Sequence, residues 1–193
     1  MQGIHHFVIK PLGDRYENEK SIGGKKLIIN SEISNHEYVN RRAIVVSCPR
    51  VNESCIKAGD EIIVHHNVFR RWYDVKGKEK NSKAYFKDGL YLVDSSQIFL
   101  VKKEQWTAMP GFSFVQPIKN EATISSSEKE DPHKGIIKYT DGSTRIGDLV
   151  GYTPSSKYEF VVDNQRLYRV YNKFITIKYE YQGNEEAYNP SWT

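Results

Sequence analysis

The chain has 193 residues, and its 28 Lys and Arg residues against 24 Asp and Glu residues give a formal net charge of +4. This length suffices for one large domain or for two small domains of roughly 100 residues each, and an apolar content of 38% is enough to build hydrophobic cores. The apolar runs are far shorter than the roughly 18 residues of a membrane-spanning helix, which excludes a transmembrane helix.

The first eight residues do not show a basic segment followed by an apolar one, the pattern of a secretory signal. We therefore expect the protein to stay in the compartment where it is made, the cytoplasm. Cys48 and Cys55 are too few for a disulfide framework, and their spacing is not that of a CxxC motif. We expect both to be free thiols.

Short segments rich in β-branched and aromatic residues recur along the chain, bounded by Gly, Pro, Asn and Asp. Such segments are typical of strands. No stretch of ten or more residues shows the apolar spacing of an amphipathic helix. The sequence therefore predicts an all-β protein, with strands at 7–9, 43–46, 62–64, 90–93 and 98–101.

Four segments of the first half recur, in the same order, in the second half. Residues 7–12 are echoed by 114–118, 43–46 by 135–138, 57–62 by 145–150, and 88–93 by 165–170. The separation between partners shrinks from 106 residues, between Pro11 and Pro117, to 77 residues, between Leu90 and Leu167. The second copy is therefore expected to be the same scaffold with shorter loops.

Pro110 and Gly111 interrupt the pattern between the two copies, which predicts a short Pro/Gly linker. The predicted domains are residues 1–107 and 108–178. Residues 179–193 form a tail after the last expected strand. The first domain holds 18 basic and 13 acidic residues, and the rest of the chain holds 10 and 11, so the positive charge lies in the first domain.

The first copy carries two long polar loops, at 12–43 and 64–84. In the second loop, basic and aromatic residues are interleaved, a pattern typical of proteins that bind single-stranded nucleic acid. The patch is short and the overall charge is small, which favours another interpretation, in which the aromatic residues pack on their own domain or on a neighbouring subunit. The candidate contact residues, for a subunit or an anionic partner, are Arg70, Arg71, Trp72, Tyr73, Lys76, Lys78 and Lys80.

Catalytic and metal sites have little support in the sequence. Neighbouring residues on a strand point to opposite faces, so the pairs His5-His6 and His65-His66 would have to meet in space to bind a metal. The chain holds neither a G-x-S-x-G nucleophile motif nor a G-x-x-x-x-G-K phosphate loop. We therefore predict no catalytic residue, no metal site and no cofactor.

Residues 9–15, Ile-Lys-Pro-Leu-Gly-Asp-Arg, resemble the N-terminal strand of chaperonin-10, the GroES-type co-chaperonin family. Gly59-Asp60 and residues 90–100 are similar to later strands of that family. The resemblance covers residues 7–102 and extends more weakly over 113–178. It implies two tandem GroES-like β-barrels in one chain, whereas the family has one barrel per chain and seven chains in a ring.

The family also has a loop with two glycines and an apolar triplet, which docks on the large chaperonin ring. The matching residues here are Gly23, Gly24, Leu27, Ile28 and Ile29, so the resemblance implies a partner-binding site at these positions. The alternative is that residues 27–29 form an ordinary edge strand. The corresponding loop of the second copy, residues 120–134, has neither feature.

The resemblance implies a non-enzymatic binding and assembly protein that caps a chaperonin chamber through an apolar loop. The duplication and the altered second loop favour an alternative, a structural decoration or auxiliary protein of a virus (phage) capsid that uses the same barrel as a clamp. Exposed strand edges predict self-association. The expected partners are thus a chaperonin ring or a capsid lattice, rather than a membrane or a nucleic acid. The expected location is the host cytoplasm, or the virion if the protein is a capsid component.

Overall fold

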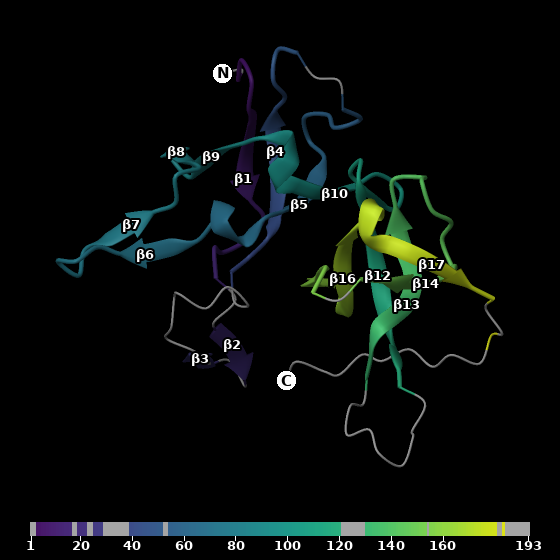
Figure 1. The fold of residues 1–193 in the computed structure, drawn as a ribbon. Coiled ribbons are helices and arrows are strands. Elements are labelled where there is room, and N and C mark those ends of the chain that lie inside the picture. Colours follow the sequence, from purple (N-terminus) through teal and green to yellow (C-terminus); the bar gives the residue numbers. More distant parts are fainter. Residues whose placement is uncertain are drawn as a thin grey trace. The chain divides into compact units, whose positions relative to one another are not determined.

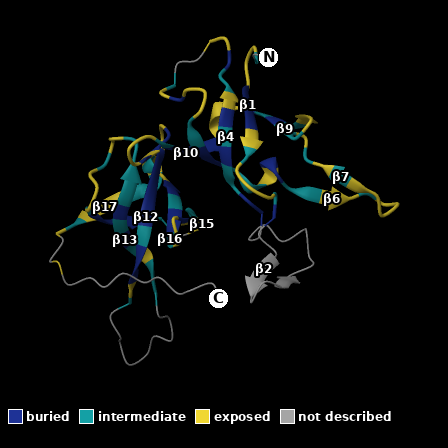
Figure 2. Ribbon diagram, turned by 180° about the vertical axis from the view of Figure 1, so that it is seen from behind, coloured by how far each residue is buried: buried dark blue, intermediate teal, exposed yellow. Residues whose placement is uncertain are grey.

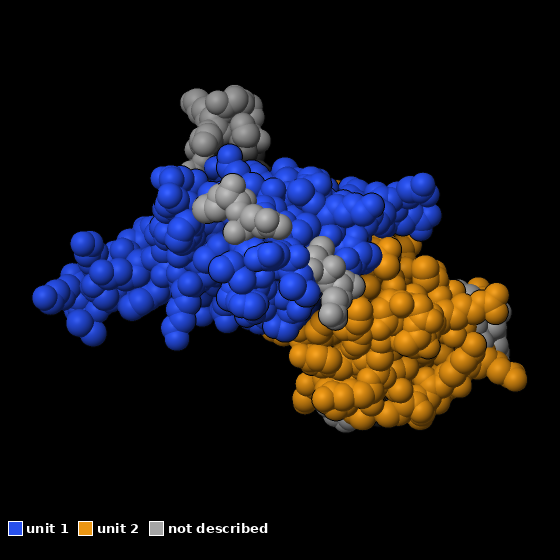
Figure 3. All heavy atoms as spheres, turned by 90° about the horizontal axis from the view of Figure 1, so that it is seen from above, with its two compact units in different colours: residues 1–105 blue, residues 106–193 orange. Residues whose placement is uncertain are grey.

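The computed structural model describes residues 3–16, 19–22, 25–28, 39–51, 54–120, 130–153, 155–180 and 183. The chain divides into two compact units, residues 1–105 and 106–193 (Figure 3). Within the described residues, the regular structure consists of β-strands and three short 3-10 helices. The predicted all-β class is confirmed.

Unit 1 is built on an antiparallel sheet in the order β10-β5-β4-β1-β9-β8 (Figure 1). Two further hairpins, β2–β3 and β6–β7, stand outside this sheet. The elements are β1 (Phe7–Pro11), β2 (Glu19–Ile22), β3 (Lys25–Ile28), β4 (Arg42–Ser47), β5 (Glu61–Val64), η2 (His66–Val68), β6 (Arg71–Tyr73), β7 (Glu79–Asn81), β8 (Tyr85–Lys87), β9 (Leu90–Val93), η3 (Ser95–Gln97) and β10 (Ile98–Lys102).

Unit 2 contains an antiparallel sheet in the order β17-β14-β13-β12-β16-β15. Its elements are β11 (Trp106–Ala108), β12 (Phe112–Lys119), β13 (Glu130–Thr140), β14 (Leu149–Tyr152), β15 (Lys157–Val162), β16 (Gln165–Tyr171), η4 (Asn172–Phe174) and β17 (Ile175–Tyr179). Strand for strand, this order matches that of the unit 1 sheet.

The two sheets also share their register. On β1, Ile9 pairs with Val45 of β4, and a bulge precedes Ile9. On β12, Val115 pairs with Ile137 of β13, and a bulge precedes Val115. The repeat seen in the sequence is therefore also a repeat of strand order, residue pairing and bulge position.

A glycine turn before β5 recurs before β14. Gly59 donates a hydrogen bond of 2.7 Å from its amide to the carbonyl oxygen of Val45, and Gly147 donates one of 2.9 Å to that of Ile137. Their φ angles are +92° and +88°, a region that favours glycine because it lacks a Cβ. The Gly-Asp pairs of the repeat thus fix the same turn in each unit.

The two predicted β-barrels are not confirmed, because neither sheet closes in the described part of the chain. A barrel requires the first and last strands of the sheet to pair. In unit 2 the terminal strands β15 and β17 do not pair with each other, and in unit 1 the terminal strand β8 pairs within the described residues with β9 alone. The three-residue strand β8 offers little backbone for such a pairing.

Both units have an apolar core beneath the central strands of their sheets, shown in dark blue in Figure 2. In unit 1 the consecutive residues Phe7, Val8 and Ile9 are all buried, so both faces of β1 are covered. In unit 2 the core cluster draws on β12, β13, β14 and β16, with Val115, Ile137, Val150, Tyr152, Tyr168 and Val170. Equivalent strands therefore carry the core in the two units.

A close approach of two backbones in unit 2 gives the first prediction. Gly135, the equivalent of Ala43, pairs with Pro117. A Cβ at Gly135 would lie 2.5 Å from the carbonyl oxygen of Gln116 and 2.5 Å from Cγ1 of Val115. We expect Gly135→Ala to lower the free energy of unfolding by about 1–3 kcal/mol, the usual cost of overpacking, in urea denaturation.

The matched control is Ala43→Gly at the equivalent position of unit 1. This change creates no clash, and we expect it to cost about 0.5–1 kcal/mol of backbone entropy in addition to one small buried side chain. If Gly135→Ala were as stable as the wild type, the contact between β12 and β13 would not constrain this position.

Candidate functional site

Unit 1 differs from unit 2 in two long insertions. The connection from β1 to β4 covers residues 12–41, and the connection from β5 to β8 covers residues 65–84. The unit 2 equivalent of the second insertion is only residues 153–156. The register places Pro11 opposite Ala43 and Ala43 opposite Ile62, so both insertions leave the sheet at the same end.

The second insertion forms a hairpin that extends away from the sheet of unit 1 (Figures 1 and 2). We call residues 70–83 the arm. Its strands pair Trp72 with Lys80 and Tyr73 with Glu79. At the tip, Oδ1 of Asp74 accepts two backbone hydrogen bonds of 2.9 Å, from residues 76 and 78, which fix the turn.

The base of the arm is held by Arg15, which belongs to the first insertion. Its Nε and Nη2 donate hydrogen bonds of 3.1 and 2.9 Å to the carbonyl oxygen of Phe69, and its Nη1 donates one of 2.7 Å to Oδ1 of Asn81. Phe69 is buried against Tyr91, with ring centroids 4.8 Å apart. One guanidinium thus joins the backbone of the buried residue Phe69, just before the arm, to Asn81 on strand β7 of the arm.

Tyr16 adds a second anchor beside Arg15. Its hydroxyl accepts a 2.7 Å hydrogen bond from the amide of Arg71, whose guanidinium lies 4.6 Å from the centre of the Tyr16 ring. The sequence analysis did not identify Arg15 or Tyr16 as residues of this site. Arg15 was visible as the last residue of the 9–15 motif, but no local pattern links it to residues 54 and 66 positions away.

The arm presents its aromatic residues to solvent. Trp72 is 51% exposed, Tyr73 is 56% exposed, and the tip residue Val75 is fully exposed. Adjacent residues on a strand face opposite sides, so the two rings lie on opposite faces of the hairpin. The core of unit 1 does not cover these rings, in contrast to the interpretation that they pack on their own domain.

The arm also concentrates the charge of the chain. Its six basic and two acidic residues give a balance of +4, equal to the net charge of the whole protein. Arg71 pairs with Glu79 at 3.3 Å, and Lys80 pairs with Asp74 at 3.7 Å. Lys76 and Lys78 are exposed, and within the described residues neither has an ion pair. Two unpaired positive charges therefore stand at the tip.

Most residues of the predicted docking loop lie outside the part of the chain that the structure describes. Leu27 and Ile28 belong to β3, which pairs with β2 in a separate two-stranded sheet. Gly23, Gly24 and Ile29 lie outside the described residues. The role of this segment in partner binding therefore stays a prediction.

A cluster of charged and phenolic groups in unit 2 is a second candidate. Glu130 accepts hydrogen bonds from Nζ of Lys157 at 2.8 Å, from Nη1 of Arg166 at 2.6 Å and from the hydroxyl of Tyr168 at 3.0 Å. Burial raises the pKa of Glu130. The hydrogen bonds and the positive charges of Lys157 and Arg166 lower it by more than burial raises it, so the pKa of Glu130 lies below its ordinary value. A fully bonded, ionised carboxylate of this kind suits a structural ion pair better than proton transfer.

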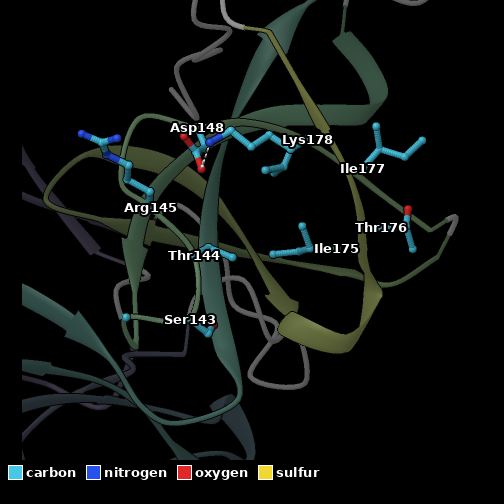
Figure 4. A pocket seen from close by; sticks show the side chains of 10 residues that line it. Ser143, Thr144, Arg145, Asp148, Ile175, Thr176, Ile177 and Lys178 are labelled. Atoms are coloured by element: carbon cyan, nitrogen blue, oxygen red, sulfur yellow. Dashed lines mark ion pairs between the residues drawn. The ribbon is translucent and has the colours of Figure 1, made fainter.

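Unit 2 also has an open pocket of about 680 Å³ (Figure 4). It lies between the turn at 142–148 and the edge strand β17, and Thr144, Ile175 and Thr176 are among its lining residues. Three lining residues are charged, and two of them, Asp148 and Lys178, pair with each other at 2.9 Å, while Arg145 is the third. In unit 1, the equivalent of the exposed Thr176 is the buried Phe99.

Metal and membrane sites have no support in the described part of the chain. No group of three or more His, Cys, Asp or Glu residues there is arranged to hold a metal ion. No helix in those segments has the length and apolar character to cross a membrane. The rings of His65 and His66, one of the two histidine pairs, lie 4.2 Å apart at the start of the second insertion.

Comparisons with protein-family models, with curated proteins and with solved structures found no match to this chain. The resemblance to the co-chaperonin family therefore depends on the motif residues alone. The anchored arm of unit 1 is the site that the structure defines best.

The anchoring of the arm gives the second prediction. We expect Arg15→Ala to lower the free energy of unfolding by about 1.5–3 kcal/mol, because it removes charge-assisted hydrogen bonds to a partly buried carbonyl. Amides of β6 and β7 should then exchange with deuterium faster. The control Arg70→Ala removes the same charge beside the base of the arm but none of these bonds. Unchanged exchange rates in Arg15→Ala would contradict the anchoring role.

The Glu130 cluster gives a pH-dependent prediction. Because the folded-state pKa lies below the ordinary value of 4.5, the Glu130 charge favours folding above that pH, and this contribution is lost as the pH falls through the folded-state pKa. We expect Glu130→Gln to cost about 1–3 kcal/mol at neutral pH. The difference from the wild type should shrink in acid, as measured by urea denaturation at several pH values. A constant difference would show that the loss is steric.

Proposed function

We propose that the protein is a non-enzymatic binding and assembly protein, in which a repeated β-sheet scaffold carries partner-binding insertions on unit 1. The observation that supports this most is the contrast between the units. Strand order, register and bulge position repeat, whereas the long insertions at 12–41 and 65–84 belong to unit 1. Binding residues lie disproportionately on loops that a rigid scaffold positions, so the insertions are the expected place for a function.

The base of the first insertion supports a docking role. Asn40 donates hydrogen bonds from its side chain to the carbonyl oxygens of Leu12 and Asp14, at 2.8 and 2.7 Å, and from its amide to that of Arg15 at 2.9 Å. The two ends of the insertion are thus fixed together. Fixing the ends of a loop removes part of the entropy that binding would otherwise cost.

For the partner, we propose a large chaperonin ring that is bound through Leu27, Ile28 and Ile29. This choice follows the resemblance of residues 9–15 and of the Gly23-Gly24 loop to GroES-type co-chaperonins. A capsid lattice is the alternative, in which a GroES-like barrel serves as a clamp on a virus particle. The duplication and the absence of Gly-Gly from residues 120–134 favour this alternative. In both cases we expect the chain to self-associate through exposed strand edges.

A chaperonin assay tests the proposal. The protein is mixed with a host chaperonin and ATP, and the rates of ATP turnover and of substrate refolding are measured. We expect the wild type to inhibit turnover or to promote refolding. Ile28→Asp should abolish the effect, because a carboxylate in an apolar groove carries a large desolvation cost.

The matched control is Ile146→Asp, which introduces the same charge at an exposed isoleucine in the turn before β14 of unit 2, away from the strand edges. This control should act like the wild type. If the wild type leaves the chaperonin unaffected, the ring is the wrong partner. Cosedimentation of the wild type with purified phage capsids would then favour the lattice.

A further inference from the structure

We propose that the arm binds single-stranded nucleic acid, with bases stacked on Trp72 and Tyr73 and phosphates contacted by Lys76 and Lys78. This activity goes beyond the docking role proposed above and does not depend on it. It also differs from the sequence-based expectation, which placed nucleic acid outside the set of partners.

The aromatic residues of the arm are placed to stack. Trp72 and Tyr73 are each about half exposed, on opposite faces of a two-stranded ribbon. The indole Nε1 of Trp72 donates a 3.2 Å hydrogen bond to the carbonyl oxygen of Asn81 on the facing strand. The ring is thus tied to the hairpin by its polar edge while much of its surface stays in solvent. A pre-positioned ring loses little entropy when a base stacks on it.

The charge of the arm supplies a second, independent observation. Residues 70–83 carry a net charge of +4, equal to that of the whole protein, while residues 106–193 carry a net charge of −1. The internal ion pairs of the arm involve Arg71 and Lys80, and the tip lysines remain outside them in the described chain. Positive charges that are not already paired are those that release counterions from a phosphate backbone.

The base of the arm holds these groups in fixed relative positions. Arg15 and Tyr16 bond to the beginning and the end of the arm, and the hydroxyl of Ser82 donates a hydrogen bond of 2.5 Å to the carbonyl oxygen of Val68, which is buried. At the equivalent place in unit 2, the connection between β14 and β15 is only residues 153–156. The arm is therefore an anchored addition to the repeated scaffold.

An acidic protein surface is the rival partner, and the arrangement of the rings argues against it. A protein interface gathers its aromatic anchors in one contiguous patch that becomes fully buried. On the arm, the two rings face opposite sides, and lysines lie beside them at the edge and the tip. A flexible single strand can follow such a ribbon from one face to the other, which a rigid protein surface cannot.

Binding to a fluorescently labelled 20-nucleotide oligo(dT) tests the proposal, by fluorescence anisotropy over a range of salt concentrations. Relative to the wild type, we expect Trp72→Ala to weaken binding roughly 5- to 150-fold, which is the effect of losing one stacked base. Lys76→Glu combined with Lys78→Glu should reduce the slope of log affinity against log salt by about 1.4, for two phosphate contacts of about 0.7 each.

Two control variants separate a site from general charge attraction. Phe86→Ala removes an exposed ring on β8, outside the arm, and the double variant Lys10→Glu and Lys57→Glu changes the net charge by the same amount as the tip variant. Both should bind the oligonucleotide as the wild type does. Ile28→Asp should also bind normally, so that failure of the chaperonin assay and failure of this assay are distinguishable.

Three results would overturn the proposal. The first is a wild type that does not bind the oligonucleotide at low salt, which would favour a protein as the partner of the arm. The second is an equal loss of affinity in the control charge variant, which would reduce the effect to net charge. The third is equal binding of a DNA duplex with no effect of Trp72→Ala, because a duplex does not offer its bases for stacking.

Discussion

The antiparallel register between the first strand of each unit and its neighbour is the constraint on which the rest of the structure depends. A slip of one residue would turn the buried side chains of β1 or β12 to the opposite face of the sheet. The bulge before Ile9 and before Val115 fixes that register, and the glycine turn that bonds to Val45 or to Ile137 fixes the next strand against it. Each sheet is therefore specified at its centre, and its edges are free to vary.

The two units differ most in the connections between strands, at one end of the sheet. Both insertions of unit 1 start at the end of the sheet marked by Pro11 and Ala43, and they meet through Arg15 and Tyr16. A long connection costs only slightly more closure entropy than a short one, so such additions need little compensation from the scaffold. The hydrogen bonds of Arg15 and Tyr16 join the base of the first insertion to the second one.

The sequence was sufficient to predict the all-β class and the repeat, because β-branched runs and the paired prolines and glycines are local features. It was not sufficient to predict whether the sheets close, since closure depends on whether β8 meets β10 and β15 meets β17, far apart along the chain. The role of Arg15 was hidden for the same reason. The charge of the arm was visible in the sequence, whereas the exposure of Trp72 and Tyr73 was not, because it depends on how far the hairpin extends from the core.

The arm carries the whole net charge of the chain on one hairpin that extends away from the sheet of unit 1 (Figure 1). The rest of the chain holds 22 basic and 22 acidic residues, so an approaching anionic surface attracts the arm and exerts a torque on the molecule rather than a uniform pull. At physiological ionic strength this torque acts within a Debye length of about 8 Å. The placement of the lysines thus sets the orientation in which the protein first meets an anionic partner, before any contact between side chains has formed.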